Sequence, residues 1–80
     1  MTDITLDTLL LFESATISFI NPNTPIEVRA KGFGIIENTL VKCVGISPSG
    51  DPKAYLIRGS VVAIRNEDAK NFIIKNIKKC

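Results

Sequence analysis

The chain has 80 residues, 45% of them hydrophobic and 22% charged, and a formal net charge of +2 at pH 7. This length predicts one small domain spanning residues 1–80, with about 60% of the unfolded surface buried on folding. The sequence contains no histidine, which removes the side chain that most often serves as a general base or metal ligand near neutral pH. We therefore predict that the protein is not an enzyme.

The composition also bears on location. The longest apolar run, Leu9 to Phe12, is far shorter than the roughly 20 residues that cross a bilayer. The N-terminus carries Asp3 and Asp7 without the basic residues of a signal peptide. We expect no direct membrane insertion and a cytoplasmic location. One interpretation of the two cysteines is a disulfide between Cys43 and Cys80. The favoured interpretation is a buried Cys43 and a free Cys80, because nothing indicates an oxidising compartment.

Charge is distributed unevenly along the chain. Residues 1–28 carry four acidic and no basic residues, whereas residues 29–80 carry all ten basic residues and four acidic ones. The four lysines from Lys70 onward are interpreted as a solvated terminus, and the alternative is attraction for an acidic partner or a phosphate. Only Phe72 lies among these lysines, so the stacking surface of a single-strand binder is missing and we expect no nucleic-acid partner.

The first elements have clear local signals. Residues 5–9 suggest a single helical turn, and the alternation of apolar and polar residues over 15–19 predicts a strand with one buried face. A capping box then begins a short helix, in which the Thr24 hydroxyl accepts from the Glu27 amide and the Glu27 carboxylate from the Thr24 amide. Three residues share one face of this helix and are predicted to lie in the core: Ile26, Ala30 and Phe33.

The helix is expected to end at Gly32 or Gly34, either of which can adopt a left-handed conformation. A second, more buried strand follows over 40–46, and the turn-forming residues 47–52 predict a loop. These signals place the short helix between the first and second strands.

The remaining elements are a hairpin, a turn and a strand. Residues 54–58 and 61–65 flank Gly59-Ser60, which predicts a two-residue type II′ connection. Asn66 is expected to cap one helical turn, and residues 72–74 to form the last strand. The fold class is therefore mainly β, a small, partly open five-stranded barrel, in which closure would protect the edges of so small a sheet.

Several segments, in this order and spacing, resemble the FeoA family, the small ferrous iron transport protein A. The helix ends in Gly-Phe-Gly-Ile, a Pro-Ser-Gly-Asp-Pro loop follows the second strand, and an Ala-Ile-Arg strand end precedes Glu-Asp-Ala. The matching segments are 26–35, 48–52, Gly59, 63–65 and 67–69.

The resemblance implies an SH3-like barrel that acts in bacterial ferrous iron uptake by binding the cytosolic part of the FeoB-type membrane GTPase transporter. One alternative is an FeoA-like regulatory or transition-metal-binding domain of a metal-responsive system. A peptide-binding SH3 module would need an aromatic groove, for which too few aromatic residues remain once Phe19 and Phe33 are assigned to the core. A nucleic-acid-binding barrel is the third alternative.

Candidate contact residues come from three places. Adjacent isoleucines in an extended segment cannot both face inward, so Ile35 and Ile36 are candidate surface residues. The Gly50-Asp51-Pro52 turn has a structural interpretation and a partner-contact interpretation, while Arg58 and Arg65 could pair with Asp51 or Glu67. The predicted partner-binding residues are Ile35, Ile36, Gly50, Asp51, Pro52 and Arg58.

We expect neither a cofactor nor a dedicated metal site. Ferrous iron prefers imidazole and carboxylate ligands that converge from several positions. The carboxylates and the two thiols of this chain show no recognisable ligand spacing.

Overall fold

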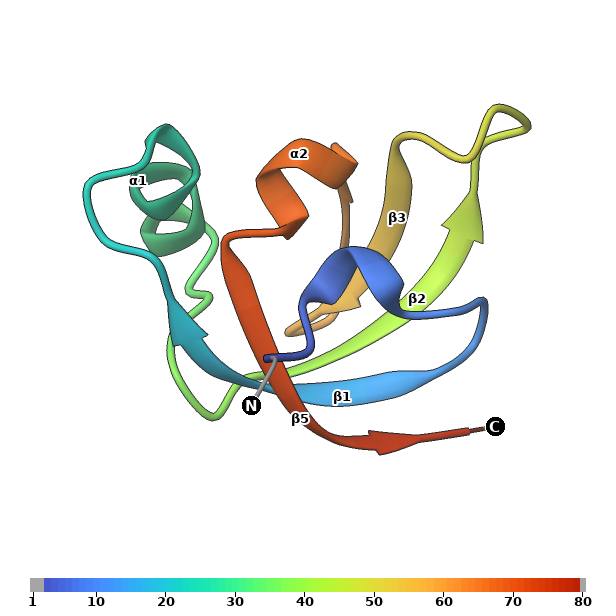
Figure 1. Cartoon of the computed structure of the whole chain (residues 1–80), viewed down its shortest axis with the longest axis horizontal. Helices are drawn as coiled ribbons and strands as arrows, with labels where there is room; N and C mark the ends of the chain where they lie inside the picture. Colours follow the sequence, from blue (N-terminus) through green and yellow to red (C-terminus); the bar gives the residue numbers. More distant parts are fainter. Residues whose placement is uncertain (1–2, 80) are drawn as a thin grey trace.

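The computed structural model describes residues 3–79 and contains five strands and three short helical elements. Figure 1 shows the curved sheet, with the 3-10 turn η1 and helix α2 on the same side of strands β1 and β2. The elements are η1 (Leu6–Thr8), β1 (Ser14–Ile20), α1 (Pro25–Gly32), β2 (Leu40–Ile46), β3 (Lys53–Ile57), β4 (Ser60–Ile64), α2 (Asn66–Ala69) and β5 (Phe72–Lys78).

The five strands form one antiparallel sheet with the order β4-β3-β2-β1-β5. The mainly β fold, with a helix after the first strand and a helical turn before the last, is confirmed. Closure of the barrel was the wrong expectation, because β4 and β5 lie at opposite edges of the sheet. After β4 the chain continues directly into α2, and α2 packs against η1. Strand β4 does not pair with β5.

Alternate residues of every strand enter a single apolar core. Cys43 is fully buried there, as expected, whereas Cys80 lies outside the described residues. The core consists of Leu6, Leu9, Ala15, Ile17, Ile26, Ala30, Ile35, Val41, Cys43, Tyr55, Ile57, Val62, Ile64, Ala69, Phe72 and Ile74.

The N-terminus of α1 has the predicted cap. The Thr24 hydroxyl accepts a hydrogen bond from the Glu27 amide at 3.3 Å, and Pro25 occupies the first turn. The return bond differs by one residue, since the Glu27 carboxylate accepts from the Asn23 amide at 3.4 Å rather than from Thr24.

The C-terminus of α1 decides which residues reach the core. Gly34 adopts φ +76, the Gly34 amide donates to Lys31 O, and the Ile35 amide donates to Ala30 O, which together form a Schellman motif. Ile35 therefore folds back beneath the helix and is 2% exposed. Phe33 sits at the cap and is 47% exposed, so its predicted core position is wrong.

Phe19 is the second aromatic residue predicted to be core and found exposed. The register between β1 and β5 shifts between Ile17 and Phe19. Such a bulge changes the face toward which the following side chains project. Ile17 is fully buried, whereas Phe19 is 40% exposed.

The β3–β4 hairpin uses a different turn from the predicted one. Ile57 pairs with Ser60, so the two connecting residues are Arg58 and Gly59 rather than Gly59 and Ser60. Both have positive φ, 52° and 83°, as a type I′ turn requires and a type II′ turn does not.

Side chains of β3 hold the predicted N-terminal turn, η1, in place. The Tyr55 hydroxyl donates to Leu6 O at 3.3 Å. The Lys53 ammonium donates to Asp7 O and, at 3.2 Å, to Leu9 O. These side-chain bonds tie three carbonyls of residues 6–9 to β3, and Leu6 O also accepts from the Leu9 amide at 3.1 Å.

Candidate functional site

The predicted contact residues lie in two separate places. Gly50, Asp51 and Pro52 precede β3, whereas Arg58 follows it. The two groups are therefore at opposite ends of this strand. Ile36, which is 59% exposed, joins Arg58 in one shallow depression.

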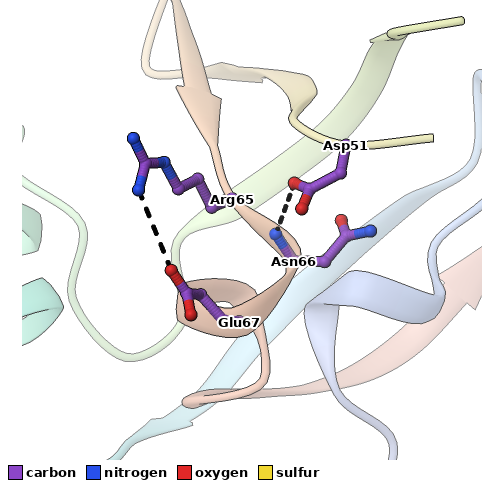
Figure 2. A network of polar contacts seen from close by, with 4 residues as sticks. All are labelled: Asp51, Arg65, Asn66 and Glu67. Carbon is purple, nitrogen blue, oxygen red and sulfur yellow. Dashed lines mark hydrogen bonds and ion pairs between the residues drawn. The ribbon is translucent and has the colours of Figure 1, made fainter. Parts of the chain in front are cut away.

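Asp51 binds the N-terminus of α2 (Figure 2). Its carboxylate Oδ1 accepts from the Asn66 amide at 2.9 Å, and the Asn66 side-chain amide donates to Gly50 O at 3.0 Å. Arg65 occupies the N-cap position without a side-chain bond, so Asn66 is the first helical residue rather than the predicted cap. The Gly50–Asp51 turn thus supplies the cap from a distant part of the chain.

The predicted arginine pairs are found only in part. Arg65 lies 3.9 Å from the Glu67 carboxylate (Figure 2), and both side chains are largely exposed. An exposed pair of this kind contributes about 0–1 kcal/mol. Arg58 extends over Gly34 instead, and no ion pair involves it within residues 3–79.

Asp51→Ala should lower the free energy of unfolding by about 1 kcal/mol, because it removes the side-chain acceptor at the N-terminus of α2. Glu67→Ala is a matched control, since it removes the neighbouring carboxylate and only an exposed ion pair. Its expected cost is below about 0.5 kcal/mol. Urea denaturation of both variants measures the difference, and equal costs would contradict the capping role.

The two isoleucines behave differently. Ile35 is buried beneath α1, so the expectation that it faces a partner is wrong. Ile36 is exposed and keeps its place as a candidate contact. Only one of the two adjacent isoleucines faces inward, as expected, and the Schellman motif decides that it is Ile35.

The side of the sheet that faces away from the core carries exposed apolar residues. Lys42 pairs with Leu56, and Leu56 with Val61, so these side chains project from the same face. Leu40 is 70% exposed and Val61 65%. We call this surface the outer face; its apolar members are Ile36, Leu40, Leu56, Val61 and Ile77, and its basic members are Lys42, Arg58 and Lys78.

Three shallow depressions of about 400 Å³ each share Leu40, and together they are lined by every member of the outer face except Val61. Their linings contain one acidic residue, Glu37, against the three basic members of the outer face. The Lys42 ammonium also lies 5.9 Å from the centre of the Phe12 ring, which is itself half exposed. Contiguous exposed apolar surface with a polar rim is typical of a protein-interaction site.

Sequence reasoning missed most of this surface, although a signal was present. The second strand begins Leu40, Val41, Lys42, Cys43, so that large apolar residues occupy positions on both faces of the strand. We interpreted this pattern as deeper burial. In the structure Val41 and Cys43 face the core, whereas Leu40 and Lys42 face outward. Leu40 is an apolar residue at a strand position whose side chain points to solvent, and this was the signal of an interaction surface.

Two buried groups of the core, the Cys43 thiol and the Tyr55 hydroxyl, have shifted pKa values. Burial raises the pKa of the Cys43 thiol, and burial is also the main cause that raises the pKa of the Tyr55 hydroxyl. Both groups are therefore protonated at neutral pH. Within residues 3–79, no three His, Cys, Asp or Glu side chains come together as metal ligands would.

None of the helices between residues 3 and 79 is long and apolar enough to cross a membrane.

Residues 4–76 match the FeoA domain family. This chain belongs to the FeoA family. FeoA proteins are small accessory proteins linked to ferrous iron transport, and they are not a known family of enzymes. The family expected from the sequence is thus confirmed.

Solved FeoA structures share this fold. The FeoA-like protein of Clostridium acetobutylicum is 26% identical, with a TM-score of 0.84 over 94% of this chain and 88% of that one. FeoA of Stenotrophomonas maltophilia, solved with zinc and described as a procaryotic SH3 domain protein, is 23% identical, with a TM-score of 0.84 over 95% and 96%. FeoA of Chlorobium tepidum is 18% identical, with a TM-score of 0.81 over 89% and 68%. A search among curated proteins found no match.

Proposed function

We propose that this FeoA-family chain is a cytoplasmic accessory protein of ferrous iron uptake that binds the cytosolic part of an FeoB-type transporter. The observation that carries the proposal is the outer face, where exposed Leu40 and Leu56 line one depression together with the three basic members of that face. Family membership supports the connection with iron transport.

The physical argument for a protein partner rests on exposure and charge. A monomeric domain gains nothing from leaving Leu40 and Val61 in water, because each would be more stable buried. Basic residues around an apolar centre attract an acidic surface and orient it before contact. A partner with acidic residues around an apolar patch fits this face best.

We also propose that the protein acts without a dedicated metal site. The absence of a converging ligand group in residues 3–79 supports this view. Stoichiometric binding of ferrous iron in an anaerobic titration would instead favour the metal-binding alternative.

Leu40→Asp should weaken binding to the cytosolic domain of the transporter by at least about tenfold, since it places a charge in the centre of the contact. Val28→Asp is the matched control, because Val28 on α1 is 71% exposed and Leu40 is 70% exposed. We expect the control to bind as the native chain does. Isothermal titration calorimetry measures both affinities.

Two results would count against the proposal. No association of the native chain at high micromolar concentration would contradict the partner. Equal affinities of the two variants would place the contact away from the outer face.

A further inference from the structure

Strand β4 is an unprotected edge of the sheet. It has a paired neighbour, β3, on one side only. Its residues, 60–64, read Ser-Val-Val-Ala-Ile, with no charge and no proline, and they pair with β3 without a bulge. Proteins usually protect an edge strand with charged residues, proline or a bulge, because the free peptide groups of the edge can otherwise pair with another chain.

The opposite edge, β5, is protected in the usual ways. Thr5 forms a bridge with Ile73, so the N-terminal segment covers part of this edge. The second half of β5 carries Lys75 and Lys78, and its register with β1 shifts twice. The contrast within one small sheet makes β4 the edge that is open to a partner.

The hairpin geometry identifies the free peptide groups. The two-residue turn makes Ile57 and Ser60 a hydrogen-bonded pair, and bonded and non-bonded pairs alternate from there. Val61 and Ala63 therefore direct their N–H and C=O groups away from β3. Between residues 3 and 79, these groups form no backbone hydrogen bond with another element, and both side chains are exposed.

Charge indicates what kind of strand would pair there. Arg58 and Arg65 flank β4, one just before it and one just after it. In an antiparallel pair of two copies centred on Val62, Arg65 of each copy would lie next to the β3–β4 turn of the other, near Arg58. The two arginines repel each other in such a pair, although the Glu67 carboxylate, 3.9 Å from Arg65, offsets part of this repulsion. Arg58 forms no ion pair within residues 3–79, so an acidic residue on a different chain favours pairing more than a second copy does.

We propose that β4 binds an extended segment of a partner protein, with acidic residues at its ends, as a sixth strand. The inference rests on the proposed function, because it assigns a docking mode to the same partner. Main-chain bonds to Val61 and Ala63 supply the affinity, and alternate apolar side chains of the segment extend the outer face beyond Val61. The segment's carboxylates lie beside Arg58 and Arg65.

The test uses a peptide of about 6 residues in which valine and threonine alternate between terminal glutamates. Titrated to about 1 mM into the isotopically labelled chain, it should shift the amide resonances of Val61 and Ala63 more than those of β5. Ala63→Pro, which removes one outward donor, should weaken binding by about tenfold or more. Ala63→Val keeps the donor and should bind as the native chain does. The amide spectrum of each variant reports whether it is folded.

Unchanged resonances of residues 60–65, or equal binding by the proline and valine variants, would overturn the docking mode. Titration with the transporter's cytosolic domain separates the two proposals. If the domain binds and shifts other residues only, the proposed function stands and the β4 inference fails. If the peptide binds β4 and the domain does not, the proposed function fails. Shifts at β4 that grow with protein concentration alone would show that a second copy is the occupant.

Discussion

Phe72→Ala should lower the free energy of unfolding by about 3–5 kcal/mol, because the Phe72 ring is fully buried and alanine leaves a cavity in a thin core. The matched control is Phe33→Ala. Phe33 is 47% exposed at the end of α1, so its loss should cost no more than about 1 kcal/mol. Urea denaturation followed by circular dichroism measures both.

An 80-residue domain has little stability to lose, so Phe72→Ala is expected to be largely unfolded in buffer. Phe72→Leu extends the test, since it keeps most of the apolar volume and should remain folded with a cost of about 1–2 kcal/mol. Similar costs for alanine at Phe72 and at Phe33 would contradict the arrangement of the core.

Stability should fall as the pH rises above 9. The ordinary pKa is 9.0 for the Cys43 thiol and 10.0 for the Tyr55 hydroxyl, and burial raises both in the folded protein. The folded chain therefore retains protons that the unfolded chain loses in this range. Each retained proton lowers the free energy of unfolding by about 1.4 kcal/mol per pH unit. The stabilisation is complete below pH 9 and declines more steeply once the pH passes 10.

Urea midpoints measured from about pH 8 to about pH 11 would show this decline. Cys43→Ala should remove the part that begins near pH 9, and Tyr55→Phe the part that begins near pH 10. Tyr55→Phe also leaves Leu6 O without its side-chain donor, which lowers stability by about 1 kcal/mol at every pH. If the slope is unchanged in both variants, these groups are not the cause.

Much of the fold is predictable from local signals. The Thr24 cap and Gly34 define α1 because their hydrogen bonds join residues only three to five positions apart. Alternation locates β1 and β2 because the side-chain period of a strand is a property of the backbone itself. Local signals locate the hairpin to within one residue but not its turn type, since Arg58 adopts a positive φ that its residue type does not favour.

The candidate site is much less predictable. Ile36 and Arg58 were identified, but Leu40, Leu56 and Val61 become one surface only through the register of three strands. Gly50, Asp51 and Pro52 were predicted as contacts because they form the turn before β3 and belong to the Gly-Asp-Pro loop that resembles the family. In space they lie at the other end of that strand, where Asp51 caps α2.

The amino-acid sequence by itself determined the elements, their order, the single apolar core and the family. Tertiary structure alone decided that Phe19 and Phe33 are exposed while Ile35 is buried, that the sheet stays open and that β4 is left without a neighbour. The reason is the range of the interactions. Caps, turns and alternation act within a few residues, whereas bulges, strand register and edge pairing depend on segments that meet only after the chain has folded.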